Sequence, residues 1–523
     1  MPSWLKDAVF YEIYPQSYYD SNGDGIGDIP GIIQKLGYIA GLGCNALWLN
    51  PVYDSPFWDA GYDVRDHKKV APRYGTNEDL FRLFSEAHCL GIHVILDLVP
   101  GHTSFDHPWF IESKKAEPGP MSGRYVFTKS VWDMPPGYRW VSGLTERDGN
   151  YLASFFSSQP ALNYGFNIID YPGWQDPPDH PDCLATIEAM KDVMRYWLDN
   201  GADGFRVDMA DSLVKNDDDK TATSLLWRSI RGMLDDEYPE AAMVSEWSDP
   251  ERAINMAGFH MDFYLDHWHN GYHSLVRSRV DGQNRSYVSK NGPWDVTGFT
   301  SDFVPKYEAT RGNGYISFIT CNHDTPRLTR FLDESEIRLA YAMLFTLPGV
   351  PFLYYGDEIG LRFIEGLHSK EGGYNRTGTR TPMQWDAGRN LGFSDADPSK
   401  LYLPVDNSAD APTVASQQGL PGSLLNTVKS VITLRRRFED LNADGDFEVV
   451  HAQPGDPLFV YRRGSLFLFV NPGDKDAVMD WNRPEMPENI VFELSEGING
   501  HSDYISKQRR QFRLPPRSFT VMN

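Results

Sequence analysis

The chain has 523 residues, more than one ordinary compact core holds, which excludes a single small binding module. Hydrophobic residues make up 41% and charged residues 23% of the chain, a globular composition that excludes extensive disorder. The chain has 49 basic and 72 acidic residues, which gives a formal net charge of −23. This excess of negative charge argues against nucleic acid or another polyanion as the partner.

The start of the chain and its cysteines indicate the compartment. The first residues, MPSWLKDAVFYEIYP, have no basic segment followed by an apolar one, as a secretory signal has. The chain also has no apolar run of about 18 residues, the length that predicts a membrane span. Cys44, Cys89, Cys183 and Cys321 lie far apart, which predicts buried thiols and no disulfide framework. We therefore expect a cytoplasmic protein with no membrane partner.

Short apolar runs alternate with amphipathic segments through most of the chain, and this alternation predicts strands and helices. The predicted strands are residues 8–14, 46–49, 93–99, 204–207, 243–246, 263–265, 316–320 and 351–355. Near-continuous apolar strands separated by helices are typical of a parallel sheet. Eight such repeats favour a (β/α)8 TIM barrel over an open sheet.

Helix signals lie between these strands. Pro30 marks a helix start ahead of apolar residues at positions 32, 33, 36 and 39. Thr76 and Asp79 form an acidic variant of the capping box at the start of another helix. A third helix is predicted from Leu184 to Trp197, with Gly201 as its end.

Two stretches break the alternation and predict further domains. Residues 102–181 are rich in Pro, Gly and aromatic residues and are far longer than an ordinary loop after a strand, so we expect an inserted domain there. Short strands follow near the C-terminus, with an Arg463-Gly464 hairpin signal, so residues 441–523 are expected to form a small antiparallel β domain. Those strands are predicted at 447–452, 457–463, 465–472, 490–497 and 517–523. Residues 1–101 and 182–440 remain for the barrel.

Reactive residues gather at the C-terminal ends of the predicted strands, where (β/α)8 enzymes carry their functional groups. They are Asp97, His102, Arg206, Asp208, Glu246, His323 and Asp324. Any one carboxylate could simply cap a helix. However, Arg206 and Asp208 share one face of an apolar strand, and an inward-facing carboxylate is costly unless it has a partner or a task. Three carboxylates flanked by Arg and His predict glycoside hydrolysis with retention of configuration.

Seven motifs carry a resemblance to a known family. They are DLVPGHTS (97–104), QPALNYGF (159–166), GFRVDMADS (204–212), SEWSDP (245–250), FITCNHDTPR (318–327), PGVPFLYYGDEIG (348–360) and RTPMQWD (380–386). In this order they resemble the α-amylase superfamily, glycoside hydrolase family 13, and within it the α-glucosidase and oligo-1,6-glucosidase branch. The resemblance implies a (β/α)8 barrel, a domain inserted after the third strand and a C-terminal antiparallel β-sandwich.

The resemblance also implies roles for the site residues. Asp208 is the expected nucleophile, Glu246 the acid/base and Asp324 the carboxylate that binds sugar hydroxyls in the transition state. Arg206 is expected to hold Asp208 ionised, because a nearby cation lowers a carboxylate pKa. The expected substrate-binding residues are Asp59, Tyr62, His102, Arg206, His323 and Arg380.

The segment DAGYD resembles the family's glucosidase pattern, in which an acidic residue pairs with a later arginine across the pocket floor. Here the pair is expected between Asp59 and Arg380, with Tyr62 stacked on the sugar ring. A closed floor admits only a chain end, so the pattern favours exo-action. Asp59 can also be read as a turn aspartate beside Gly61.

The loop DSNGDGIGD offers oxygen ligands at alternate positions, as the first half of an EF-hand loop does. It is not an EF-hand, because position twelve is Gly31 and not Glu. A similar loop in this branch binds calcium, which implies a structural Ca²⁺, or Mg²⁺, here. The expected ligands are Asp20, Asn22, Asp24, Asp28 and the carbonyl of Ile26. The alternative is an Asx-rich turn with no metal.

The function implied by the resemblance is a retaining, exo-acting α-glucosidase that removes terminal non-reducing glucose from short oligosaccharides through a glucosyl-Asp208 ester. A transglycosylase or isomerase of the same family, of the sucrose isomerase or trehalose synthase type, stays open because it uses the same intermediate with another acceptor. A non-catalytic protein like the transporter heavy chains is a remote alternative, because all three carboxylates are present. The expected partner is a small oligosaccharide, and the protein is expected to be a monomer or a small homo-oligomer.

Met209, directly after the expected nucleophile, bears on linkage. In this branch that position tends to be Val in α-1,6-specific members and Ala in α-1,4-specific ones. Met is flexible and can fold away from a ligand, which favours α-1,4 or mixed substrates. The alternative is that Met209 only fills the top of the barrel.

Overall fold

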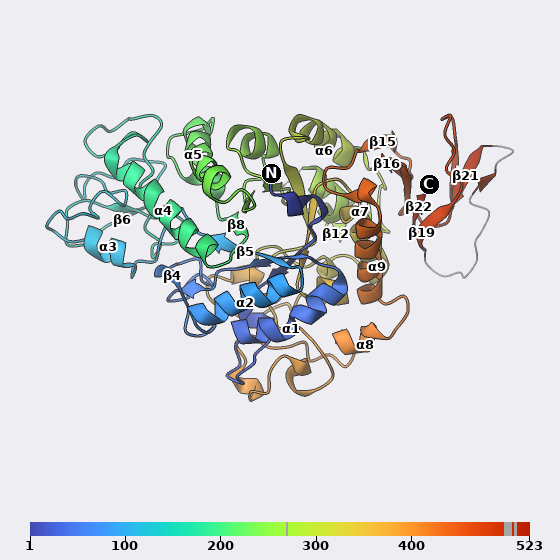
Figure 1. The fold of residues 1–523 in the computed structure, drawn as a ribbon, viewed down its shortest axis with the longest axis horizontal. Helices are drawn as coiled ribbons and strands as arrows, with labels where there is room; N and C mark the ends of the chain where they lie inside the picture. The colour runs from blue at the N-terminus through green and yellow to red at the C-terminus, as the bar shows by residue number, and fades with distance from the viewer. Residues whose placement is uncertain (268–269, 496–504, 507–509) are drawn as a thin grey trace.

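The computed structural model describes residues 1–267, 270–495, 505–506 and 510–523, and its centre is a closed barrel of parallel strands (Figure 1). The barrel strands are β1 (Phe10–Ile13), β2 (Ala46–Leu49), β5 (His93–Leu98), β8 (Gly204–Val207), β9 (Ala242–Ser245), β10 (Met261–Phe263), β13 (Tyr315–Ile319) and β14 (Val350–Tyr354). They pair in chain order, and β14 returns to β1, where Phe10 lies opposite Phe352. The predicted (β/α)8 barrel is confirmed.

Helices cover the outside of the barrel, and several of them begin at a side-chain cap that the sequence supplies. They are α1 (Ile29–Leu42), α2 (Asn77–Cys89), α4 (Pro181–Asp199), α5 (Thr221–Glu237), α6 (Thr297–Thr310), α7 (Glu334–Leu344), α8 (Val414–Gln418) and α9 (Leu424–Arg437). The predicted capping box of Thr76 and Asp79 is present at α2. Asp28 caps α1 by accepting a hydrogen bond from the Gly31 amide at 2.6 Å. With helices outside and a packed interior, every residue of β2 and β8 is buried, as their apolar sequences predict.

Between β5 and α4 the chain leaves the barrel, at the left of Figure 1. This segment contains α3 (Pro108–Ser113) and a small sheet of β6 (Trp140–Val141) and β7 (Tyr151–Leu152). It has a small hydrophobic cluster of its own, formed by Val126, Leu152, Ala161 and Phe166. The limits of the inserted domain at residues 102 and 181 stay a prediction. Short strand pairs also occur at β3 (Tyr53–Asp54) with β4 (Asp66–Val70), and at β11 (Arg279–Val280) with β12 (Gln283–Asn284).

The C-terminal part, at the right of Figure 1, contains two antiparallel sheets. The larger has β15 (Glu448–His451), β16 (Phe459–Arg463), β17 (Leu466–Asn471), β22 (Ser518–Met522) and β19 (Ile490–Leu494), and the smaller has β18 (Ala477–Asp480), β21 (Gln511–Leu514) and β20 (Ile505–Ser506). The rings of Phe469 of β17 and Phe512 of β21 pack between the sheets in a tilted arrangement, with their centres 4.9 Å apart. The sequence did not predict the smaller sheet. Residues 496–497 of the predicted strand 490–497 lie outside the described residues.

Three of the cysteines match the prediction of buried thiols and one does not. Cys44, Cys183 and Cys321 are buried and free, whereas Cys89 is exposed at the last residue of α2. The prediction for Cys89 was wrong because this turn of the helix faces solvent.

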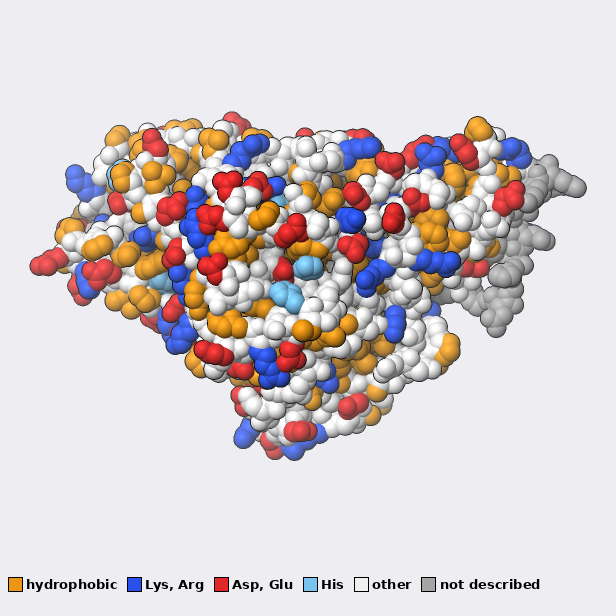
Figure 2. Space-filling view, in the orientation of Figure 1, with side chains coloured by type: hydrophobic (Ala, Val, Ile, Leu, Met, Phe, Trp, Pro, Cys, Tyr) orange, Lys and Arg blue, Asp and Glu red, His pale blue; other side chains and the backbone are white. Residues whose placement is uncertain are grey.

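None of the helices in the described residues is long and apolar enough for a membrane span. The face shown in Figure 2 carries acidic and basic side chains interspersed, without a broad basic patch.

Substitution of Gly204 tests how closely β8, the strand that carries Arg206, must approach β9. It starts β8 with a φ of +145°, and an added Cβ would lie 2.0 Å from the Ala242 carbonyl oxygen of β9. We predict that Gly204→Ala lowers the free energy of unfolding by more than about 1 kcal/mol, since both the backbone and the neighbouring strand oppose a side chain. Gly37→Ala in α1 is the control, because its added Cβ meets no atom within 4 Å and should stabilise the helix by about 0.5–1 kcal/mol. Equal melting temperatures for both variants would contradict the prediction.

Candidate active site

One buried guanidinium binds three carboxylates at the C-terminal ends of neighbouring strands. Asp97 of β5 pairs in register with Arg206 of β8, and the chain continues from β8 into Asp208 and from β9 into Glu246. Arg206 Nη1 lies 2.7 Å from Asp97 Oδ1 and 3.1 Å from Asp208 Oδ1, and Nη2 lies 2.7 Å from Glu246 Oε2. The Arg206 side chain is 1% exposed. The parallel register therefore brings together the residues that the sequence placed at separate strand ends.

The turn after β8 fixes the geometry of Asp208. Met209 has a φ of +43° and a ψ of +46°, a left-handed conformation that a non-glycine residue adopts only when its surroundings hold it there. The Met209 amide donates a hydrogen bond to Glu246 Oε2 at 3.0 Å, and the Asp208 amide donates to the Leu98 carbonyl at 2.9 Å. The turn thus connects the two catalytic candidates directly.

Asp324 lies in a second charged group. Arg376 Nη1 is 2.7 Å and Arg380 Nη2 is 2.9 Å from Asp324 Oδ1, and His323 Nε2 is 3.4 Å from Oδ2. Arg380 also donates from Nε to the His323 carbonyl at 2.8 Å. Asp324 is therefore held by two cations and keeps its second oxygen toward His323.

The expected salt bridge between Asp59 and Arg380 was wrong. Arg380 is committed to Asp324, and the cation paired with Asp59 is Arg376, at 3.9 Å from Nη2 to Oδ1. Gln159 donates to Asp59 Oδ2 at 2.7 Å. An acidic residue and an arginine do pair here, but the arginine is the one four residues earlier in the chain, and a closed pocket floor stays a prediction.

Tyr62, His102 and His323 occupy different depths. The Tyr62 hydroxyl donates to Asp97 Oδ2 at 3.0 Å and contacts His323 Nε2 at 2.8 Å. His323 Nδ1 lies 3.0 Å from Glu12 Oε1, so protein groups occupy both of its nitrogens beneath Tyr62. His102 Nε2 lies 3.1 Å from the Tyr62 carbonyl, which can only accept, so Nε2 carries the proton and the unpartnered Nδ1 is an acceptor. The substrate-binding role expected of His102 stays a prediction, because its Nδ1 is buried and its Nε2 is bonded within the protein.

These groups surround a cavity of about 210 Å³. It is lined by Asp59, Tyr62, His102, Phe155, Asp208, Met209, Glu246, Asp324, Arg376 and Arg380. Arg206 and His323, which were expected to bind substrate, lie behind this wall. The volume is below the roughly 300–1,000 Å³ of sites for drug-sized ligands, so the cavity suits one small ring.

Burial and charge set the protonation of the carboxylates. Burial raises the pKa of Asp208 above its usual range, and the carboxylates of Glu246 and Asp97 add to this, while Arg206 opposes both. Arg206 was expected to hold Asp208 ionised; it does lower this pKa, but burial outweighs its effect. Burial raises the pKa of Asp59 to about 6. At Asp324 burial is outweighed by His323, Arg376 and Arg380, which hold its pKa well below the usual value.

Arg376 and Phe155 line the cavity but were not predicted from the sequence. Arg376 lies in the 3-10 helix η8 (Tyr374–Thr379), four residues before Arg380 of the RTPMQWD motif, and this spacing is the one signal that could have found it. Phe155 is 42% exposed and comes from the inserted segment.

A neighbouring hollow of about 370 Å³ shares Met209 with the cavity and is also lined by Tyr138, Arg139 and Lys215. Met209 therefore stands between the cavity and the space beyond it.

The predicted metal ligands form a loop held by its own hydrogen bonds. Asp20 Oδ2 accepts from the Gly25 amide at 2.7 Å, and Asp28 Oδ2 accepts from the Ser21 hydroxyl at 2.9 Å. The side-chain oxygens of Asn22 and Asp24 each accept from the amide two residues on, at 3.0 and 2.9 Å. Within the described residues no three His, Cys, Asp or Glu side chains are grouped to hold a metal. In this arrangement the residues fit an Asx-rich turn better than an ion, and the calcium or magnesium ion stays a prediction.

The metal prediction can be tested through stability. A bound ion raises stability through RT ln(1 + [L]/Kd), so Ca²⁺ should raise the melting temperature of EDTA-treated protein. Asp24→Ala should abolish that rise, because Asp24 is an expected ligand. Asp397→Ala is the control, since Asp397 makes a similar local hydrogen bond to the Ser399 amide outside the loop. No response to EDTA or Ca²⁺ would contradict the prediction.

Comparisons with known proteins identify the family of the chain. A family model described as the α-amylase catalytic domain matches residues 12–444. A trehalose synthase/amylase of Mycolicibacterium smegmatis is 34% identical, covering 94% of this chain and 86% of the relative. A probable oligo-1,6-glucosidase of Bacillus subtilis is 30% identical, covering 91% and 92%. The crystal structure of isomaltulose synthase from Erwinia rhapontici aligns with a TM-score of 0.82 at 24% identity over 100% of this chain and 99% of that one, which shows the fold. The protein therefore belongs to the α-amylase family, glycoside hydrolase family 13.

Proposed function

We propose that the protein is a retaining, exo-acting α-glucosidase that removes terminal non-reducing α-linked glucose from short oligosaccharides. The observation that carries the proposal is the guanidinium of Arg206, which binds Asp208 and Glu246 at 3.1 and 2.7 Å. Because both carboxylates contact the same guanidinium, they lie close to each other. Retaining enzymes hold their carboxyl groups about 5–5.5 Å apart, whereas inverting enzymes separate them by about 6.5–9.5 Å.

The proposed reaction has two displacements. Asp208 attacks the anomeric carbon while Glu246 gives its proton to the glycosidic oxygen, so the leaving sugar departs as an alcohol. Glu246 then takes a proton from water, which attacks the glucosyl-Asp208 ester and restores the free carboxylate. Asp324, kept ionised by Arg376 and Arg380, binds hydroxyls of the sugar as positive charge develops on the ring.

Exo-action is supported by the small cavity. Its volume of about 210 Å³ and the pairing of Asp59 with Arg376 leave room for a terminal sugar and block a chain that continues past it. The reducing side of the substrate then leaves past Met209 toward the 370 Å³ hollow. We also propose a cytoplasmic location and a monomer or small homo-oligomer.

A second candidate is an isomerase of the trehalose synthase type. The relative that favours it is the trehalose synthase/amylase of Mycolicibacterium smegmatis, at 34% identity. Such an enzyme would form the same ester but pass the glucosyl group to a retained glucose and not to water. The two candidates differ in the acceptor, which depends on how long the leaving sugar stays beside the ester.

The test is a time course with maltose, isomaltose, trehalose and sucrose, followed by proton NMR. The proposal expects glucose as the main product of maltose and α-glucose as the first anomer released. Trehalose as the main product would favour the isomerase. β-Glucose as the first anomer would contradict both candidates.

Met209 is expected to influence linkage. We predict that Met209→Val raises the isomaltose-to-maltose ratio of kcat/KM by roughly tenfold, a difference of about 1.4 kcal/mol in transition-state binding. Because Met209 already has a φ of +43°, a β-branched residue adds backbone strain, so the ratio and not the absolute rate is the measure. Met209→Ala is the matched variant and should leave the ratio near that of the wild type. Equal ratios in all three proteins would make Met209 a packing residue.

Protonation of Asp59 should determine how kcat/KM falls at acid pH. Its pKa is raised by burial to about 6, so below that pH the side chain becomes neutral and no longer balances Arg376. We predict that kcat/KM falls about tenfold per pH unit below pH 6, and that Asp59→Asn lowers kcat/KM at pH 7 and flattens this limb. A wild-type profile that stays level to pH 4.5 would contradict the prediction.

A further inference from the structure

A buried carboxyl group with no role in the proposed reaction lies behind the wall of the catalytic cavity. Glu12 of β1 is 0% exposed and pairs in register with Trp48 of β2 and Tyr354 of β14. Its Oε1 lies 3.0 Å from Nδ1 of His323 and accepts a hydrogen bond from Asn50 Nδ2 at 3.2 Å. In the described part of the chain, Glu12 Oε2 has no hydrogen-bond partner. A negative charge here would be costly, because one of the two oxygens that share it has neither water nor a donor.

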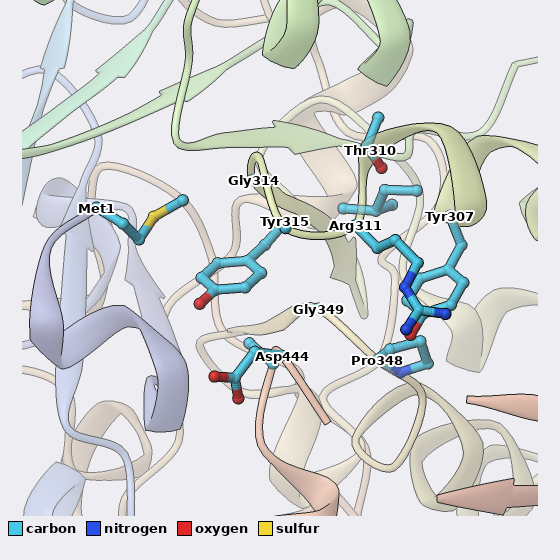
Figure 3. Close-up of a pocket in the computed structure, with 12 residues that line it drawn as sticks. Met1, Tyr307, Thr310, Arg311, Gly314, Tyr315, Pro348, Gly349 and Asp444 are labelled. Carbon is cyan, nitrogen blue, oxygen red and sulfur yellow. The ribbon is translucent and has the colours of Figure 1, made fainter. Parts of the chain in front are cut away.

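Polar side chains at the opposite end of the barrel differ from Glu12 because they meet water. Tyr315 and Asp444 line a hollow of about 410 Å³ there (Figure 3). Asp444 is exposed and Tyr315 is half-buried, so water satisfies both side chains. Water has no such access to Glu12, so protein groups alone determine whether its carboxyl group holds a proton.

The hydrogen bonds around Tyr62 determine which nitrogen of His323 carries a hydrogen. Burial raises the pKa of Asp97 to about 6, so at neutral pH Asp97 is ionised and accepts the Tyr62 hydroxyl hydrogen at 3.0 Å. Arg206 and Trp48 donate to the same carboxylate. The Tyr62 hydroxyl has only one hydrogen, so at its 2.8 Å contact with His323 the oxygen accepts and Nε2 donates. His323 therefore carries a hydrogen on Nε2.

The other nitrogen of His323 is then an acceptor that faces Glu12. Burial and three nearby arginines hold the pKa of His323 well below its usual value despite the charge of Asp324, so the ring is neutral and Nδ1 has a free lone pair. An ionised Glu12 would place a second lone pair and a negative charge 3.0 Å from that nitrogen. Burial also raises the pKa of Glu12 well above its usual range, which favours the protonated acid.

We propose that Glu12 is a positioning residue, which carries a proton and donates a hydrogen bond to Nδ1 of His323. The hydrogen on Nε2 is thereby held toward the Tyr62 hydroxyl and Asp324 Oδ2, at 2.8 and 3.4 Å. The rings of Tyr62 and His323 also stack, with their centres 5.3 Å apart. Tyr62 and Asp324 line the cavity, so Glu12 acts on the reaction through them. The positioning role rests on the proposed function, whereas the proton on Glu12 does not.

The proton is tested by infrared spectroscopy of the full chain labelled with ¹³C-glutamate, in which a protonated acid and a carboxylate absorb at different frequencies. The spectrum of Glu12→Gln is subtracted from that of the wild type at pH 7, so that all other glutamates cancel. We expect the difference to be a band of a protonated acid. A carboxylate band in its place would overturn the proposal.

The positioning role is tested by the kinetics of maltose hydrolysis. Glu12→Gln keeps an N–H that can donate to Nδ1, so its kcat should stay within about threefold of the wild type. Glu12→Leu has no donor and should lower kcat at least about tenfold while KM changes less than about threefold. The effect falls on kcat because Asp324 contributes most as positive charge develops on the sugar.

Glu358→Leu is the matched control. Glu358 is also 0% exposed with an unpartnered Oε2, but its Oε1 accepts from Tyr11 and Tyr38 and it does not line the cavity. Both leucine variants remove a buried carboxyl group, so their melting temperatures should fall by similar amounts. Only Glu12→Leu should lose kcat, and Glu358→Leu should stay within about twofold of the wild type.

The outcomes separate this proposal from the proposed function. Equal losses of kcat in the two leucine variants, or a loss in Glu12→Gln as large as in Glu12→Leu, overturn the positioning role and leave the function standing. The infrared band decides whether Glu12 holds the proton even where Glu12→Leu does not fold. A protonated Glu12 in a protein that acts on no α-glucoside supports the proton and contradicts the proposed function.

Discussion

The rest of the site depends on the ion pairs that the buried guanidinium of Arg206 makes with three carboxylates. The guanidinium neutralises part of the charge of Asp97, Asp208 and Glu246, which would otherwise repel one another at the top of the barrel. Removing such a partner leaves buried charges uncompensated, at a cost of about 3–5 kcal/mol in comparable pairs. The barrel's closed hydrogen bonding holds β5, β8 and β9 in the register that this cluster needs.

The two charged groups of the cavity have opposite electrostatics. Burial and neighbouring carboxylates raise the pKa of Asp208, while two arginines and His323 hold the pKa of Asp324 low despite its burial. When the surroundings push the pKa values of two carboxyl groups in opposite directions, the two groups take different roles in catalysis. Asp324 is suited to a permanent negative charge, and the group around Arg206 is suited to exchanging protons and charge during a reaction.

Much of the fold was predictable because strands and helices leave local signals. The apolar runs of β2 and β8 and the capping box at Thr76 depend on neighbouring residues alone. The smaller C-terminal sheet was missed because β18 alternates partly exposed residues in only four positions, too few for a periodic signal. Arg376 was missed for a different reason. Its place beside Asp59 and Asp324 follows from the path of the loop before Arg380, which no local pattern encodes. For the same reason the depth of His323 and Arg206 behind the cavity wall could not be read from the motifs.

The central claim, that Asp208 is the nucleophile beside the acid/base Glu246, is tested most directly by trapping the ester. The protein would be treated with 5-fluoro-α-glucosyl fluoride and digested, and the labelled peptide identified by mass spectrometry. The account predicts one fluoroglucosyl group on the peptide that contains residues 204–212, attached to Asp208. A label on Glu246 or Asp324, or turnover of the probe with no labelled peptide, would contradict it.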